Sequence, residues 1–141
     1  MLILVDNRSG EELPEAAYQA LAEFVLTSEG AAEESELSVS LIDVREMHAL
    51  NLAYRGIDAP TDVLAFENDW PLLGDVIICP EVAREHARDF SSDFASEMEL
   101  MLTHGILHLC GYDHESDASA EAMEAREAEL LQTWKTHKEM L

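Results

Sequence analysis

Residues 94–114 have the sequence FASEMELMLTHGILHLCGYDH, and this stretch defines the centre of the fold. Asp93 and the two serines before it are typical N-cap residues, so a helix is expected to begin at Phe94. Because a helix that is apolar on every side is stable only when it is covered on every side, residues 94–110 are predicted to form a central, buried helix. Its apolar positions are Met98, Met101, Leu102, Ile106, Leu107 and Leu109.

Three histidines lie in this stretch. His104 and His108 are four residues apart, so they share one face of the helix, one turn apart. His114 could not join them if the helix continued. Gly111, however, is typical of the left-handed residue that ends a helix, and the chain can then turn back toward the pair. Half of the six histidines fall within eleven residues, which favours a metal site over three unrelated histidines.

Three protein ligands leave one position open for water or substrate, as in catalytic zinc sites. Nitrogen ligands suit zinc best, although nickel, copper and iron can also bind such a set. Zinc would lower the pKa of a bound water to roughly 7 and supply hydroxide at neutral pH. We therefore expect one Zn²⁺ per chain. The other candidate ligands are expected to stay outside the site: His48, His86, His137 and Cys110.

The remaining chain alternates between strand and helix patterns. Short apolar or alternating segments predict four strands, at residues 2–5, 36–42, 63–66 and 75–79. Amphipathic segments with capping residues predict four further helices, at residues 13–28, 43–56, 80–90 and 117–137. This order indicates an α+β fold in which a small, mixed, four-stranded sheet is packed by about five helices. The length of 141 residues predicts a single domain over residues 1–141.

The composition limits the cellular setting and the partners. Thirty acidic residues against eight Lys and Arg give a formal net charge of −22, which opposes broad, non-specific binding to nucleic acid. The two cysteines, Cys79 and Cys110, give no disulfide framework, so we expect a cytoplasmic protein without a disulfide-linked partner. The apolar residues 1–5 end at Asp6 and predict a strand rather than a signal peptide. No apolar run is long enough to span a bilayer, so no membrane partner is expected.

The histidine spacing, HxxxHxxGxxH, is that of the metzincin peptidases, HExxHxxGxxH. In those enzymes the glutamate after the first histidine activates water and passes its proton to the leaving amine. Gly105 occupies that position here. A metallopeptidase is therefore a disfavoured alternative, and the ligand set is expected to serve another reaction.

Four segments carry a more specific pattern: NLAYRG at residues 51–56, PTDVLAF at 60–66, GDVIIC at 74–79 and HGILHLCGYDH at 104–114. Together they resemble the YbeY family, bacterial zinc-dependent endoribonucleases of ribosomal RNA maturation, and the similarity extends over nearly the whole chain. The resemblance implies a cytoplasmic, single-strand-specific endoribonuclease that acts in 16S rRNA 3′-end maturation and ribosome quality control. It also implies that single-stranded ribosomal RNA, and the small subunit or its ribosomal proteins, are the partners.

The resemblance also assigns residues to the site. It implies that His104, His108 and His114 hold the zinc and that Arg55 lies near the metal. Phosphodiester cleavage builds negative charge on the non-bridging oxygens, which a metal ion and a guanidinium can stabilise together. From its position alone, Arg55 would be interpreted as a helix-end arginine that complements the helix dipole. The family commonly has serine where this chain has Ala65, and the family's basic RNA groove contrasts with the charge of −22.

Two questions stay open at the level of sequence. Asp62 and Asp113 could each accept a hydrogen bond from a ligand histidine, but Asp62 could equally be a turn residue after Pro60.

An RNA substrate requires a neutral or positive surface beside the metal, which Arg55 would form with one of three arginines, Arg45, Arg84 or Arg88. In an alternative function, the chain is a ribosome-assembly factor that docks on basic ribosomal proteins, with zinc as a structural element.

Overall fold

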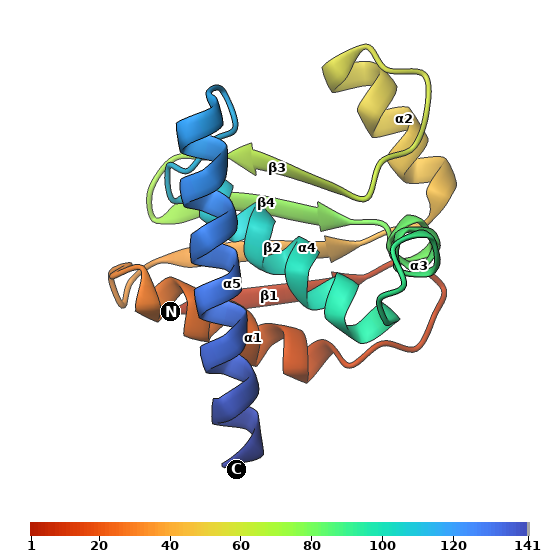
Figure 1. Ribbon diagram of the computed structural model, residues 1–141. Coiled ribbons are helices and arrows are strands. Elements are labelled where there is room, and N and C mark those ends of the chain that lie inside the picture. Colours follow the sequence, from red (N-terminus) through yellow and green to blue (C-terminus); the bar gives the residue numbers. More distant parts are fainter. Residues whose placement is uncertain (141) are drawn as a thin grey trace.

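The computed structural model describes residues 1–140, and within them the chain forms four strands and five helices (Figure 1). The strands are β1 (Leu2–Asn7), β2 (Glu36–Leu41), β3 (Val63–Glu67) and β4 (Leu72–Ile78). The helices are α1 (Glu15–Ser28), α2 (Val44–Arg55), α3 (Pro80–Asp89), α4 (Phe94–Leu109) and α5 (Asp117–Glu139). The predicted α+β class and element order are confirmed. Leu141 lies outside the described residues, and the assignment of residues 1–141 to a single domain stays a prediction.

The sheet is mixed, with the strand order β1-β2-β4-β3. β1, β2 and β4 are parallel, and β3 runs antiparallel to β4 at one edge. Most predicted boundaries differ from the structure by at most two residues, but β4 begins at Leu72 rather than at Asp75. Gly74 and Asp75 are poor strand formers. Both are nevertheless paired with β2 on one side and with β3 on the other, and these two ladders outweigh their low propensity.

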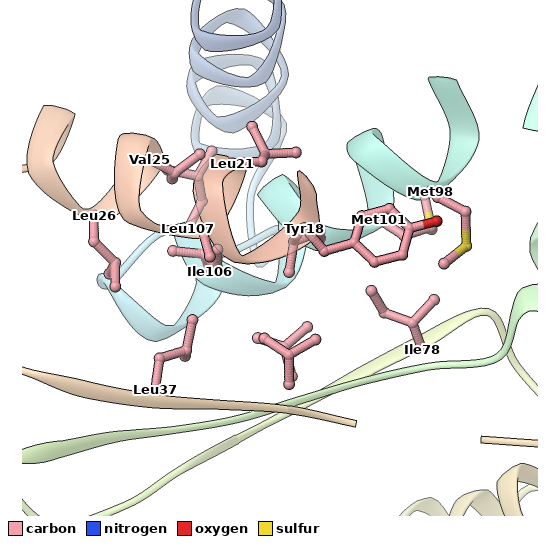
Figure 2. Close-up of a cluster of buried hydrophobic side chains, with 14 of the residues drawn as sticks. Tyr18, Leu21, Val25, Leu26, Leu37, Ile78, Met98, Met101, Ile106 and Leu107 are labelled. Atoms are coloured by element: carbon pink, nitrogen blue, oxygen red, sulfur yellow. The ribbon is translucent and has the colours of Figure 1, made fainter. Parts of the chain in front are cut away.

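The helices lie on both faces of the sheet, and one face carries most of the core. Val76 and Ile77 of β4 point to opposite faces because successive strand residues alternate. Val76 belongs to the larger cluster, which α1, α4 and α5 form with the sheet. Figure 2 shows side chains of α1 and α4 facing Leu37 of β2 and Ile78 of β4 in this cluster. Ile77 belongs to a smaller cluster that includes Met47 of α2.

Helix α4 is central, as predicted from its apolar residues, and packs against α1, α3, α5, β3 and β4. The Asp93 side chain accepts a hydrogen bond from a backbone N–H of the first turn at 2.7 Å. At the other end, the N–H of Gly111 bonds to the carbonyl of His108 at 3.1 Å. The N–H of Tyr112 bonds to the carbonyl of Leu107, also at 3.1 Å. With Gly111 at φ +105°, these bonds form a Schellman motif, so the predicted helix end at this glycine is confirmed. Within the described residues, no helix is both long and apolar enough to cross a bilayer.

Helix α4 approaches the sheet closely at Gly105. A Cβ atom at this position would lie 2.6 Å from Cγ1 and 3.2 Å from Cγ2 of Val76. Val76 is fully buried, and its β-branched side chain is restricted at χ1, so it cannot easily move aside. The packing of α4 on β4 therefore requires glycine at position 105.

Gly105→Ala should lower the free energy of unfolding by about 1–3 kcal/mol, the usual cost of overpacking a dense core. In an open helix the same change would stabilise the protein by about 1 kcal/mol, so the sign of the effect separates the two situations. Urea unfolding followed by circular dichroism measures it. Adding Val76→Ala to the Gly105→Ala protein should relieve the contact, so the second substitution should cost less there than in the wild type. A stabilised Gly105→Ala protein would contradict the close packing.

Candidate active site

A cavity of about 400 Å³ opens beside α4 at the β3 edge of the sheet. Its walls come from the end of α2, the loop that leads into β3, β3 itself, α4 and the segment after α4. The four residues that the sequence singled out, Arg55, His104, His108 and His114, all line this one cavity. The other lining residues are Thr61, Asp62, Val63, Leu64, Ala65 and Gly105.

The three histidines share the cavity. The rings of His104 and His114 stack, with centroids 4.7 Å apart and planes inclined by 21°. Among residues 1–140, however, no three or more His, Cys, Asp or Glu side chains are arranged closely enough to hold a metal ion. The turn at Gly111 thus brings His114 to the helical pair, as the spacing indicated, without a complete coordination geometry. By the chemistry of the donor set, three imidazoles on one cavity wall fit a zinc ion.

His104 has a partner that the sequence analysis missed. Its Nδ1 atom lies 2.7 Å from a carboxylate oxygen of Glu127, on α5. A carboxylate oxygen can only accept a hydrogen bond, so Nδ1 is the donor, and Nε2 is left without a proton in the neutral ring. One signal could have identified Glu127: it is a buried acid within the apolar stripe of α5, formed by Met123, Leu130 and Trp134.

The two aspartates considered as histidine partners have other contacts. Asp62 lines the cavity, but its carboxylate accepts the backbone N–H of Val63 at 2.8 Å and lies 3.2 Å from Nδ1 of His86. His86 was expected to be isolated, but it is paired with the carboxylate of Asp62. Asp113 accepts the backbone N–H of Glu115 at 3.0 Å. Hydrogen bonds from the Ser119 side chain and from this N–H lower the pKa of Asp113 below its ordinary value. These contacts support turn roles for both aspartates.

Arg55 is the last residue of α2, and Gly56 at φ +70° ends that helix. The guanidinium of Arg55 donates a hydrogen bond to the side-chain oxygen of Asn51 at 3.3 Å. Asn51 is buried, and its amide donates to the carbonyl of Ala59 at 2.8 Å, which ties the helix to the loop that leads into β3. Within residues 1–140, Arg55 is not paired with a carboxylate. Its charge is therefore available to an anion in the cavity.

The charge of the cavity comes from few residues. Arg55 and Asp62 cancel, so the lining is neutral when the histidines are neutral and positive when they are protonated. The expected contribution of a second arginine is not seen in the described residues, because none of the three candidates lines the cavity. The guanidinium of Arg84 instead pairs with Glu11 at 2.5 Å and lies 4.3 Å from the centre of the Phe94 ring.

The structure thus combines an α+β fold with a histidine-lined cavity beside its central helix. Residues 4–135 match the family model described as Endoribonuclease YbeY, and the chain belongs to this family, which confirms the resemblance seen in the sequence. Ala65, which was expected from the sequence to depart from the family pattern, is part of the cavity lining.

Curated relatives carry the family name, and a solved structure shares the fold. A protein of Frankia casuarinae named Endoribonuclease YbeY is 39% identical over 95% of this chain and 75% of its own length. Proteins of the same name from Salinispora tropica and Legionella pneumophila (strain Corby) are 37% and 40% identical over 96% and 90% of this chain, and over 98% and 85% of their own lengths. The solution structure of TM1509 from Thermotoga maritima superposes with a TM-score of 0.63 at 29% identity, covering 95% of this chain and 93% of that one.

Proposed function

We propose that this chain is a zinc-dependent, single-strand-specific endoribonuclease that acts in the cytoplasm on 16S rRNA 3′-end maturation and in ribosome quality control. Family membership supports endoribonuclease activity and a role in rRNA processing. The observation that carries the finer proposal is the meeting of Arg55 with His104, His108 and His114 in one cavity.

The three histidines would hold the ion. Bound there, zinc would supply hydroxide at neutral pH. The protein's own contribution is to fix the donors on a buried helix and its cap, which limits their reorganisation during the reaction. Arg55 has no carboxylate partner among residues 1–140 and donates a hydrogen bond to Asn51. It would stabilise the negative charge that develops on the non-bridging oxygens of the phosphodiester. A guanidinium suits this task because it can offer two parallel donors to phosphate oxygens.

The dimensions and charge of the cavity support single-stranded RNA as the substrate. The cavity is about 400 Å³, within the range of small-ligand sites, and lies recessed beside α4. A flexible, unpaired strand can bend a phosphate into such a recess more readily than a stacked duplex can. The ten lining residues carry one cation and one anion, so the net charge of −22 is not concentrated on the walls that face the reacting phosphate.

A second candidate function is favoured by the charge of the whole chain. A net charge of −22 suits docking on basic ribosomal proteins of the small subunit, with zinc as a structural element. The metallopeptidase alternative has no such support, because Gly105 leaves no room for the carboxylate base of that class.

Cleavage of a single-stranded RNA and of the same sequence in a duplex tests the enzymatic proposal. The zinc-loaded protein should cleave the single strand and leave the duplex intact. A chelator should abolish cleavage, and added zinc should restore it, because the hydroxide depends on the ion. A protein that binds one zinc per chain but cleaves neither RNA would contradict the enzymatic proposal and favour docking.

A further inference from the structure

The contact between Glu127 and His104 joins α5 to the cavity, although no residue of α5 lines the cavity among the described residues. The two side chains come from different helices, 23 residues apart, and meet at 2.7 Å. The Glu127 side chain is 10% exposed and that of His104 26% exposed. Both partners of this hydrogen bond are therefore largely shielded from water, and in such surroundings of low dielectric a hydrogen bond is electrostatically stronger than in water.

A glutamate is energetically unfavourable at this position because its surroundings are apolar. Its neighbours in the stripe of α5, Met123, Leu130 and Trp134, are 0%, 3% and 5% exposed. Burying a carboxylate among apolar side chains costs free energy unless the group is hydrogen-bonded or paired. An apolar residue would fill the same space without this cost. Among the described residues, the side chain of Glu127 makes one hydrogen bond, to Nδ1 of His104, and we attribute the presence of a carboxylate to this bond.

We infer that Glu127 is a positioning residue that holds His104 in the tautomer protonated at Nδ1, so that the Nε2 lone pair is directed to the cavity. A neutral imidazole has one proton, and whichever nitrogen carries it cannot bind a metal. The carboxylate requires a donor at Nδ1 and so keeps the second nitrogen free. It also fixes the orientation of the ring. This inference rests on the proposed metal site at His104.

The tautomer can be measured in metal-free protein by correlating the ring protons of His104 with its two ¹⁵N nuclei in NMR spectra. The His104 signal is assigned by its absence from the His104→Gln protein. In the wild type, Nδ1 should carry the proton. Glu127→Ala should shift the population toward the Nε2-protonated form, and Glu127→Gln should keep most of the Nδ1 form because an amide oxygen can still accept. Wild-type protein protonated at Nε2 would overturn the inference without any variant.

Zinc affinity gives a second, independent readout. Glu127→Ala should weaken zinc binding about 10- to 100-fold in competition with a chromogenic chelator, the usual effect of losing the partner of a ligand histidine. Glu127→Gln should fall between this variant and the wild type. The matched control is Glu124→Ala, which removes the same charge from an exposed position on the same helix and should leave both affinity and tautomer unchanged.

The outcomes separate this inference from the proposed function. A wild-type protein that binds no zinc refutes the metal site, while the tautomer measurement still tests the role of Glu127. A wild type that binds zinc, together with a folded Glu127→Ala protein of unchanged affinity and tautomer, refutes the positioning role alone. A residue that only held α5 against α4 would affect stability and leave the tautomer unchanged. If Glu127→Ala does not fold, the wild-type tautomer and the Glu127→Gln affinity decide the question.

Discussion

Replacing His108 by alanine should abolish both the binding of one zinc per chain and the cleavage of RNA. His108 lies on α4 one turn from His104, and two imidazoles cannot retain an ion that needs three protein ligands. The helix itself should survive, because alanine is the best helix former and His108 is not fully buried. Metal analysis of dialysed protein and a single-stranded RNA assay measure the two losses, and circular dichroism confirms the fold.

The matched control for this experiment is His48→Ala. His48 lies on α2, where it pairs with Asp58 at 2.7 Å, and it does not line the cavity. This variant should keep full zinc content and activity. If His108→Ala retained one zinc per chain, the three-histidine site would be refuted, and the cavity would have to act by another chemistry.

Arg55→Ala should lower RNA cleavage by about a hundredfold or more, the effect of removing one donor that stabilises developing charge. Zinc content should not change, because Arg55 is not a metal ligand. Arg55→Lys should recover part of the activity, since lysine keeps the charge but cannot offer two parallel donors. Rates under single-turnover conditions measure the effect on the chemical step.

The control for Arg55 removes the same charge from the same helix. Arg45 is exposed on the first turn of α2 and does not line the cavity, so Arg45→Ala should cleave RNA at close to the wild-type rate. If Arg55 served only to complement the dipole of α2, its loss would cost at most about 1 kcal/mol of stability and little activity. Near-normal cleavage by Arg55→Ala would remove this residue from the mechanism.

Features that depend on residues close together in the sequence could be predicted. The burial of α4 and its end at Gly111 follow from residues within one segment, and the structure confirms both. The YbeY motif placed Arg55 beside the histidines although 49 residues separate Arg55 from His104. The start of β4 was wrong because the propensities of single residues do not include the two flanking strands.

Contacts between distant side chains could not be predicted in the same way. Glu127 meets His104 across 23 residues, and Arg84 is neutralised by Glu11 across 73. Periodicity shows which face of a helix is buried, but not which side chain of another helix lies opposite. Asp62 was expected to be a partner of a ligand histidine or a turn residue, and its carboxylate instead accepts the backbone N–H of Val63 and lies next to His86.

The contact between Gly105 and Val76 also limits how this chain could change its activity during evolution. Its histidine spacing is that of the peptidase motif, and the sequence differs from the motif only at position 105. A mutation that introduced glutamate at this position would complete the motif in the sequence. The new Cβ, however, would lie 2.6 Å from a buried methyl group, so the altered chain would lose stability before it gained a base. A smaller residue at position 76 would have to come first, and by itself it would leave a cavity in the core. Whichever of the two substitutions came first, the single variant would be less stable than the present chain. A change from this activity to peptidase activity would therefore be harder than the single difference between the motifs suggests.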